Sequence, residues 1–457
     1  MEPLIVLGTQ GVGTRAAGAW ATLLADWRRF LDPRFRTFHR LALLQGLMVL
    51  AGFDVIIPFA LAIGCPPAVA ALIGALPVAG GMAQLAVPRL LARSDGNLRG
   101  LTLLATAIGE GRGIVYCLIA TGVALGVLGS LPALILLALV IFVAGVLSSV
   151  SGANLLAWYS AVLVEEDRRL VVPRLMVVAM AASALLLFPM GILLDVLAGY
   201  FGLAVYAVPF ALAGVFGVAE VLAVRRLPRP GRVIVPPRAM GEQAPETPAE
   251  RQFLRVSTVN ALGMGLTPFF SVYAISVLGL SAGFSMTMSA VSLVAMVVAA
   301  AIGGGMLARG SSARQLRASF AIRALALFLP ILALPGTLLA PLLMYATAAL
   351  ASVGFAIGQL AANERMFRLV RGPTVIRQYG RLLFRTSAAM TTGQVVSGVV
   401  LAVVPMGYLG FAALFGASSA VRVYAWRAAR TEAKPRESGA ALTPSAAAAT
   451  ASPPGGS

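Results

Sequence analysis

Charged residues are scarce in this chain of 457 residues. Only 11% of the residues are charged and 59% are hydrophobic, whereas a soluble domain carries about 25% charged residues. This leaves too little polar surface to coat a soluble protein of this length, so the composition excludes a soluble enzyme. The roughly 270 hydrophobic residues would supply about a dozen helices of the ~20 residues that cross a bilayer. We therefore expect an all-α polytopic membrane protein.

Cysteine and histidine are nearly absent. The chain has two cysteines, Cys65 and Cys117, and a single histidine, His39. These residues cannot assemble a disulfide framework, a zinc site or a histidine-based catalytic set. The glycine-rich stretches also lack the Lys and Ser that follow a phosphate-binding loop. We therefore expect no enzyme activity, no cofactor and no metal.

Apolar runs long enough to cross a membrane alternate with breaks that contain Arg, Gly or Pro, and they predict twelve transmembrane helices in two six-helix bundles. The first six runs lie near residues 41–64, 67–88, 99–127, 131–158, 172–196 and 200–223. The other six lie near 253–279, 282–308, 318–336, 338–362, 386–405 and 407–426. The expected domains are a cytoplasmic N-terminal segment (1–40), an N-terminal bundle (41–224), a cytoplasmic linker (225–251), a C-terminal bundle (252–427) and a disordered tail (428–457).

The excess of positive charge predicts how the chain is oriented. The formal net charge is +18, which in a soluble protein would suggest nucleic acid as a partner. On the map of twelve spans, however, 34 of the 35 basic residues fall on one side of the membrane and Arg112 is the exception. Basic residues favour the cytoplasmic side. We expect both termini in the cytoplasm, in what we take to be a bacterial cytoplasmic membrane.

The segment before the first span leaves two interpretations open. Its apolar residues recur at helical spacing, with Arg on the other flank, which is typical of a helix lying on an anionic membrane surface. A frayed cytoplasmic extension fits the same residues equally well. The apolar residues are Trp20, Leu23, Leu24, Trp27 and Leu31.

A short internal repeat relates the two sets of spans. Three residues near the end of the fourth span recur near the end of the tenth with a constant offset of 209. They are Gly145, Asn154 and Arg168 in the first set and Gly354, Asn363 and Arg377 in the second.

With its twelve spans, charged central linker and repeat, the chain over about 41–427 resembles the major facilitator superfamily. The stretch from Asn363 through Pro373 to Arg377 and Tyr379 is similar to that family's Asn…Val-Pro…Arg…Tyr pattern. The family's loop between the eighth and ninth spans is partly kept as 305–310, but its Asp is absent. The loop between the second and third spans also lacks this Asp in register, which puts the family's charge pairing there in doubt.

The resemblance implies a monomeric transporter of a small solute. In the family, spans 1, 4, 7 and 10 line a cavity that opens alternately to either side of the membrane. Its solutes include sugars, organic acids, peptides, nucleosides and drugs. The resemblance thus implies a mechanism without naming a solute.

Asp54 is the strongest candidate for function. It lies thirteen residues into the first span, or about 20 Å along a helix, which places it near the middle of the membrane. A charge there costs about 2.5–3.5 kcal/mol on insertion scales. A carboxyl group that gains and loses a proton would suit proton coupling. The structural alternative is an Asp that pairs with an Arg or caps a helix break before Pro58.

Glu110 and Arg112 lie about halfway through the third span, between Gly109, Gly111 and Gly113. Residues two apart on a regular helix point to opposite sides, so we expect each to find a partner on another helix. Asp54 is the candidate partner for Arg112. Both residues are candidates for substrate binding or proton coupling, and an Arg112 that faces the cavity would favour an anionic substrate. A buried structural ion pair is the favoured alternative, since span 3 is peripheral in the family.

Two further polar residues are candidates for contact with a substrate, namely Asn260 and Tyr273 of the seventh span. Asp195 and Glu220, by contrast, are expected at the membrane interface. The resulting hypothesis is a proton-coupled secondary active transporter. A non-transporting membrane sensor or scaffold with the same fold is the alternative.

Overall fold

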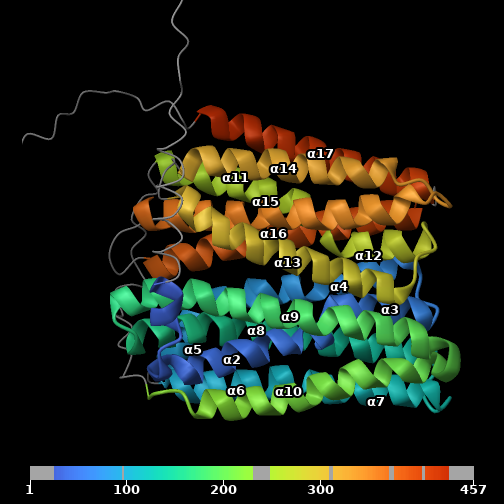
Figure 1. Cartoon of the computed structure of the whole chain (residues 1–457), viewed down its shortest axis with the longest axis horizontal. Helices are drawn as coiled ribbons and strands as arrows, with labels where there is room; N and C mark the ends of the chain where they lie inside the picture. Colours follow the sequence, from blue (N-terminus) through green and yellow to red (C-terminus); the bar gives the residue numbers. More distant parts are fainter. Residues whose placement is uncertain are drawn as a thin grey trace, which may run out of the picture.

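The computed structural model describes residues 25–94, 97–229, 248–307, 312–369, 375–403 and 407–431. Every regular element in these residues is a helix (Figure 1). The first 24 residues, the centre of the predicted linker and nearly all of the predicted tail lie outside this set. So do the side chains of Asn363, Arg377 and Tyr379, on which part of the sequence resemblance rests.

The first six spans are formed by the helices α2 to α10. Span 1 is α2 (Arg36–Leu47), η2 (Met48–Ala51) and α3 (Phe53–Ala62); span 2 is α4 (Pro67–Gly80), η3 (Gly81–Ala86) and α5 (Val87–Arg93); span 3 is α6 (Leu98–Glu110) and α7 (Arg112–Ala124); span 4 is α8 (Ser130–Val162); span 5 is α9 (Glu165–Phe201); span 6 is η4 (Gly202–Tyr206) and α10 (Ala207–Arg225).

The helices α11 to α17 form the other six spans. Span 7 is α11 (Pro248–Met264) and α12 (Thr267–Ser276); span 8 is α13 (Ala282–Leu307); span 9 is α14 (Ser312–Leu332); span 10 is α15 (Leu339–Leu369); span 11 is α16 (Val375–Val403); span 12 is α17 (Tyr408–Thr431).

The described residues confirm the predicted number of passes. Ten stretches of them are long and apolar enough to cross a membrane. The longest, Glu166–Arg225, has 60 residues, which would be about 90 Å as one helix, and it contains the two helices α9 and α10. The last helix, α17, is not among the ten. Ten stretches, one of them double, plus α17 give twelve passes.

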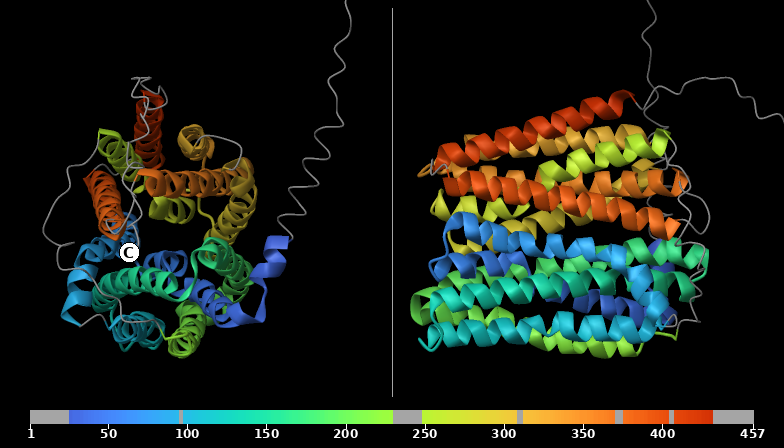
Figure 2. Two further views of the ribbon diagram at one scale, coloured as in Figure 1. Left: turned by 90° about the vertical axis from the view of Figure 1, so that its left-hand side faces the viewer. Right: turned by 180° about the vertical axis from the view of Figure 1, so that it is seen from behind.

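The twelve passes lie side by side as two halves (Figure 2). Helices α2 to α10 form the N-terminal half and α11 to α17 the C-terminal half (Figure 1). Large apolar side chains such as Leu118, Leu185 and Leu342 are exposed on the outer surface, where lipid tails would surround them. The molecule is thus an integral membrane protein.

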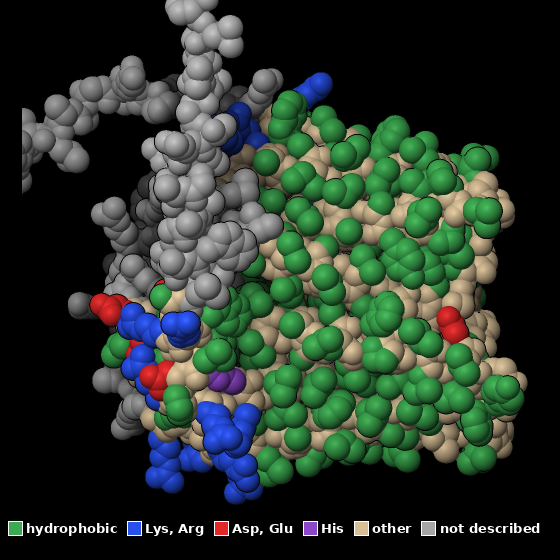
Figure 3. Space-filling model, viewed as in Figure 1, with side chains coloured by type: hydrophobic (Ala, Val, Ile, Leu, Met, Phe, Trp, Pro, Cys, Tyr) green, Lys and Arg blue, Asp and Glu red, His purple; other side chains and the backbone are tan. Residues whose placement is uncertain are grey.

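Basic side chains gather at one end of the molecule, which we call the Arg-rich end (Figure 3). Helices α6, α11 and α14 begin there, and the end is defined by the exposed residues Arg28, Arg93, Arg225, Arg226, Arg251 and Arg255. The side chains of the opposite end and the middle are largely apolar in this view. The prediction that Arg112 is the one basic residue inside the membrane is wrong, however. Arg323 of α14 and Arg422 of α17 are also buried within helices.

The largest hydrophobic cluster is shared by the two halves at one end, and the halves also touch farther along the molecule, where η3 packs against α16. At the opposite end, one hydrophobic cluster contains Ile57 and Phe210 from the N-terminal half together with Phe269 and Met286 from the C-terminal half. At the Arg-rich end, the two halves have separate clusters. The cluster of the N-terminal half contains Phe38 and Trp158. The cluster of the C-terminal half contains Phe253, Val256, Leu316, Phe320 and Ala361. The halves are therefore packed together at the opposite end.

The described part of the N-terminal segment is docked against the bundle. Phe30 is fully buried and packs beside the ring of His39. Asp26 pairs with Arg174 of α9 at 2.8 Å, and Arg34 pairs with Asp167 at 3.0 Å. From residue 25 onward the segment is therefore part of the folded N-terminal half. The residues Trp20, Leu23 and Leu24 of the predicted surface helix lie outside the described set.

Glycines allow neighbouring helices to touch through their backbones, as is common in membrane bundles. A Cβ atom on Gly113 of α7 would lie 2.5 Å from the backbone nitrogen of Gly214 of α10. By contrast, a Cβ on Gly152 of α8 would meet nothing within 4 Å.

We predict that Gly113→Ala destabilises the protein, because a methyl group at this contact would push α7 and α10 apart. Overpacking of this kind costs about 1–3 kcal/mol. The midpoint of thermal unfolding in detergent should fall for Gly113→Ala and stay within error for the control Gly152→Ala. Equal midpoints for the two variants would contradict the close contact between α7 and α10.

Candidate functional site

Span 1 is interrupted in the middle of the membrane, directly before Asp54. After α2 and η2, Gly52 adopts an extended conformation with ψ of 176°, and α3 begins at Phe53. Asp54 therefore lies in the first turn of a new helix, where the helix dipole favours a negative side chain. It is 5% exposed. Asp54 lies within the candidate membrane span Pro33–Ala62.

Asp54 connects the two halves of the molecule. Its Oδ1 accepts a hydrogen bond from the hydroxyl of Ser289 on α13, and α3 also packs against α12 and α13. A carboxylate inside a bilayer needs such a donor, because no water is available to it there. Sequence analysis missed Ser289, since a single Ser on an apolar helix carries no signal of a distant partner.

A second polar link between the halves lies nearer the opposite end. Asp195 of α9 accepts hydrogen bonds from the hydroxyl of Ser281, at 2.6 Å, and from the backbone N–H of Gly283, at 2.8 Å, where α13 begins. The backbones are in close contact there, because a Cβ on Gly283 would lie 2.1 Å from the carbonyl oxygen of Gly191. The exposed Asp195 is thus more than an interfacial residue, because it binds α9 to α13.

Glu110 and Arg112 pair with each other, so the prediction that they cannot is wrong. Arg112 Nη2 lies 3.3 Å from Glu110 Oε2. The reason is that span 3 is not a regular helix: α6 ends at Glu110 and α7 begins at Arg112. The N–H of Ile114 donates to the carbonyl of Gly111 at 3.1 Å, which tightens the turn and brings the two side chains together.

The second partner of Arg112 is Ser148 of α8 rather than Asp54. Arg112 Nη1 donates to the Ser148 hydroxyl at 2.9 Å. Every partner of this ion pair lies within the N-terminal half. The geometry fits the structural alternative that the sequence left open, a buried pair that holds spans 3 and 4 together.

Glu220, which was expected at the membrane interface, belongs to the same buried cluster. It is 3% exposed on α10 and hydrogen-bonds Gln45 of α2. One turn earlier, Gly217 allows α10 to approach the backbone of Glu110, where a Cβ would lie 2.6 Å from the Glu110 carbonyl oxygen. Two carboxyl groups and one guanidinium thus share the interior of the N-terminal half.

Asn260 lies on α11, shortly before span 7 is interrupted between Met264 and Thr267. Its Oδ1 accepts from Arg323 Nη1 of α14 at 3.4 Å. Spans 1 and 7 occupy corresponding positions in the two halves, and both are broken near their candidate residue. Breaks of this kind mark binding sites in many transporters, so Asn260 stays a candidate for contact with a solute.

Tyr273, the other predicted candidate for contact with a substrate, directs its hydroxyl to the backbone of its own half. Its hydroxyl donates to the carbonyl of Ala333 at 2.8 Å and lies 3.2 Å from that of Pro330. Its ring packs against Phe411 and Phe415 of α17. Tyr273 therefore holds α12, α14 and α17 together inside the C-terminal half.

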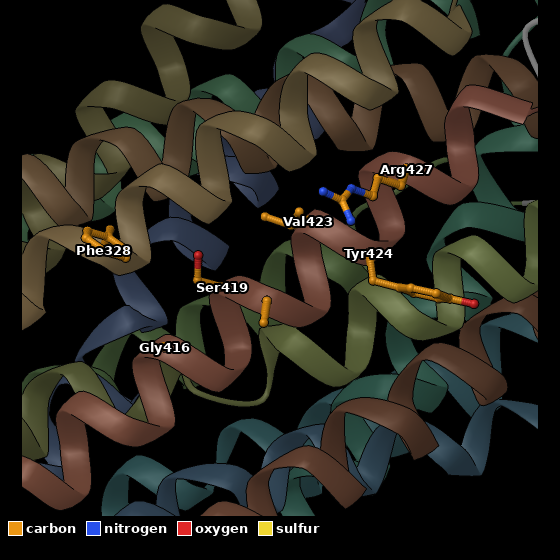
Figure 4. A pocket seen from close by; sticks show the side chains of 7 residues that line it. Phe328, Gly416, Ser419, Val423, Tyr424 and Arg427 are labelled. Carbon is orange, nitrogen blue, oxygen red and sulfur yellow. The ribbon is translucent and has the colours of Figure 1, made fainter.

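A groove of about 440 Å³ lies between α14 and α17 (Figure 4). It is mostly apolar and is lined by Phe328, Gly416, Ser419, Ala420, Val423, Tyr424 and Arg427. These residues lie on α14 and α17, and neither Asp54 nor Ser289 lines the groove. Among the described residues, no group of three or more His, Cys, Asp or Glu side chains is placed to hold a metal ion.

Comparisons with known proteins match the fold alone. No family model and no curated protein matches the chain. Among solved structures, the nucleoside transporter NupG is 13% identical, with a TM-score of 0.60 over 86% of this chain and 98% of NupG. A D-xylose-proton symporter is 11% identical, with a TM-score of 0.60 over 85% and 97%.

The same fold occurs in a bacterial homologue of the iron transporter ferroportin, solved in two states. The inward-facing state is 16% identical, with a TM-score of 0.64 over 87% of this chain and 98% of that one. The outward-facing state has a TM-score of 0.57 at 15% identity over the same shares. The chain thus shares the fold of these structures, in agreement with the transporter fold that its sequence resemblance implied. All of these matched structures are transporters.

We predict that Asp195→Ala loosens the contact between the halves at the opposite end, because it removes both hydrogen bonds to the start of α13. Spin labels at Gly199→Cys and Ser276→Cys, in a chain with Cys65→Ala and Cys117→Ala, would report the distance between α9 and α12 in lipid. Asp195→Ala should shift this distance distribution to longer values. The control Thr337→Ala removes a local hydrogen bond at the same end and should leave it unchanged. An unaltered distribution for Asp195→Ala would show that the link does not hold the halves together.

Proposed function

We propose that this protein is a secondary active transporter that moves a small solute across the membrane by alternating access. The observation that carries the proposal is the hydrogen bond from Ser289 to Asp54. It joins the two halves at a break in span 1, in the part of the membrane where a solute would have to cross. Movement of one half against the other would make and break this bond.

The described conformation fits a state that is open toward the Arg-rich end. The halves share a hydrophobic core at the opposite end and have separate cores at the Arg-rich end. The Asp195 link closes the opposite end as well. The TM-score is also higher for the inward-facing state of the ferroportin homologue than for its outward-facing state.

Proton coupling is proposed through Asp54. An ionised Asp54 accepts from the Ser289 hydroxyl, whereas a protonated one is neutral and has a donor of its own. A proton would therefore change the strength of the link between the halves. The D-xylose-proton symporter of the same fold couples its solute to protons, as its name states. Asn260 is the proposed contact with the solute.

Glu110 and Arg112 are not proposed as contacts with the solute, because they pair with each other inside the N-terminal half. The proposed boundaries are those of the sequence analysis, with a bundle on either side of the linker 225–251. We propose that the protein acts as a monomer, because the helices that carry Asp54, Ser289 and Asn260 all belong to one chain.

The Arg-rich end is proposed to face the cytoplasm of a bacterial cell. Arg and Lys are enriched in cytoplasmic loops, and the described basic side chains outside the helical cores lie at this end. Both ends of the chain would then be cytoplasmic.

We predict that a fluorescent protein fused after residue 431 becomes fluorescent in bacterial cells, whereas alkaline phosphatase fused at the same position stays inactive. The reason is that the first protein folds in the cytoplasm and the second requires the periplasm. As the control, each reporter is fused within the turn at Gly336, between α14 and α15, which is expected to give the reverse result. Active phosphatase after residue 431 would overturn the orientation.

A membrane sensor or scaffold without transport is the second candidate. A sealed, wholly apolar contact between the halves would have favoured it. The described contact instead contains two carboxylates that are bonded across it, those of Asp54 and Asp195. A transport assay separates the two candidates, because a sensor would bind a solute without moving it.

We predict that Asp54→Asn lowers solute transport about tenfold or more and removes its dependence on pH. The amide cannot take up a proton, and a hydrogen bond to a charged group is worth about 1.5–3 kcal/mol. Uptake into proteoliposomes would be measured across a pH series for a panel of nucleosides, D-xylose, iron and small carboxylates. Ser289→Ala should slow transport but keep its pH dependence.

The matched control is Ser292→Ala. Ser292 lies on the same helix, and its hydroxyl bonds Ser352 of α15 within the C-terminal half. This variant should transport as the wild type does. An Asp54→Asn variant with unchanged rate and pH profile would exclude Asp54 from coupling.

A further inference from the structure

Two buried arginines meet inside the C-terminal half. Arg323 of α14 is 4% exposed and Arg422 of α17 is 5% exposed. Both side chains reach the last turn of α11, just before span 7 is broken. Arg323 lies beside Asn260 and Met264, and Arg422 donates to the carbonyl of Gly263 at 3.1 Å.

The two guanidinium groups contact neutral partners in the part of the chain that the structure describes. Arg323 Nη1 lies 3.4 Å from both Asn260 Oδ1 and Met264 Sδ, and its guanidinium carbon lies 5.1 Å from the centre of the Phe355 ring. Arg422 Nη1 donates to the backbone carbonyl of Arg323 at 3.0 Å. Neither arginine forms a salt bridge with an acidic residue in the part of the chain that the structure describes.

The sequence offers almost no acidic residue that could balance these charges. Between residues 251 and 431 the chain contains one acidic residue, Glu364. Gly354 of α15 lies beside Arg323, because a Cβ added to Gly354 would lie 2.6 Å from Arg323 Cγ. Glu364 follows ten residues later on the same helix. Ten helical residues span about 15 Å, so Glu364 lies too far along α15 to pair with Arg323.

The end of α11 balances only part of the charge. The last carbonyls of a helix carry about half a negative charge, and Arg422 and the Ser418 hydroxyl both bind the carbonyl of Gly263. Two guanidinium groups carry two full positive charges. Burying an ion without a counter-ion costs several kcal/mol, so most of this positive charge is left without compensation by the protein.

An unused donor lies at the same place. The Nε of Arg422 is buried and has no hydrogen-bond partner among the described residues. An N–H group that is hidden from water normally finds an acceptor. A missing acceptor and an excess of positive charge both point to a negatively charged ligand.

We propose that Arg323 and Arg422 bind a small anion at the broken end of α11. The ligand is a halide such as chloride or a carboxylate, either free or carried on a larger solute. Guanidinium groups present several N–H donors in a fixed plane and suit such anions. This site goes beyond the transport proposal, because the anion binds there whether or not the protein moves a solute.

Thermal unfolding of the purified protein tests the site. The probes are sodium chloride and sodium acetate, and the reference is the sodium salt of a bulky sulfonate buffer at the same concentration. Because a ligand stabilises the state that it binds, each probe that enters the site should raise the unfolding midpoint by roughly 2–4 °C. A response to chloride alone identifies the halide, and a response to acetate identifies the carboxylate.

The variants Arg323→Gln and Arg422→Gln should lose this rise, while the control Arg427→Gln should keep it. Arg427 lies on the same helix but lines the outer groove of Figure 4. A purely structural role for Arg422, as a cap on α11, predicts a different result: Arg422→Gln would lower the midpoint equally in all three salts and leave the rise intact. That result, or the absence of any rise in the wild type, would overturn the proposal.

Bromide provides a test that needs no variant. Crystals of the wild type grown in sodium bromide should show an anomalous peak within about 4 Å of both guanidinium groups, a contact distance for an ion pair. A map without a peak there would overturn a halide site even if the glutamine variants fail to fold.

Discussion

The hydrocarbon interior offers no water, so a charged or polar group inside this molecule needs a partner in the protein or in a bound ligand. Three of the interrupted spans, spans 1, 3 and 7, show how the chain meets this constraint. Spans 1 and 7 break near Asp54 and Asn260, and span 3 breaks between Glu110 and Arg112. Each break supplies a helix end or bends a backbone, and thereby brings a polar side chain to a partner that a regular helix would not reach. The polar interior therefore depends on glycine-containing breaks such as those at Gly52 and Gly111.

The two halves share an architecture but differ in the sign of their buried charge. Spans 3 and 6 hold Glu110 and Glu220 with a single Arg, whereas the corresponding spans 9 and 12 hold Arg323 and Arg422 with no acidic residue. An amide from the first span of each half contacts the charged pair, Gln45 in one and Asn260 in the other. The repeat therefore preserves where polar groups are placed, while the chemistry in the two halves has diverged.

Hydropathy and the distribution of Arg predicted the fold well, because crossing a bilayer constrains every span independently of its neighbours. Asp54 could be located for the same reason, as an isolated charge in a long apolar run. The predictions failed wherever they assumed a regular helix or needed a contact between distant residues. Glu110 and Arg112 pair where span 3 is interrupted at Gly111, and the Tyr273 hydroxyl binds a carbonyl of its own half. The sequence pattern counts Arg323 among the basic residues on one side of the membrane. The structure places it eleven residues into α14, and its burial follows from tertiary packing, which the sequence does not reveal.

The central claim is that the two halves move against each other about the link between Asp54 and Ser289. The most direct measurement uses the wild-type residues at these positions and two pairs of spin labels in lipid, one at Gly199 and Ser276 and one across the Arg-rich end at Ala86 and Arg385. Distances would be compared at about pH 5 and about pH 8, a range in which a buried carboxyl group gains or loses a proton. The account predicts opposite changes, so that one pair lengthens as the other shortens. Distances that stay fixed at both ends, or that change together, would contradict it.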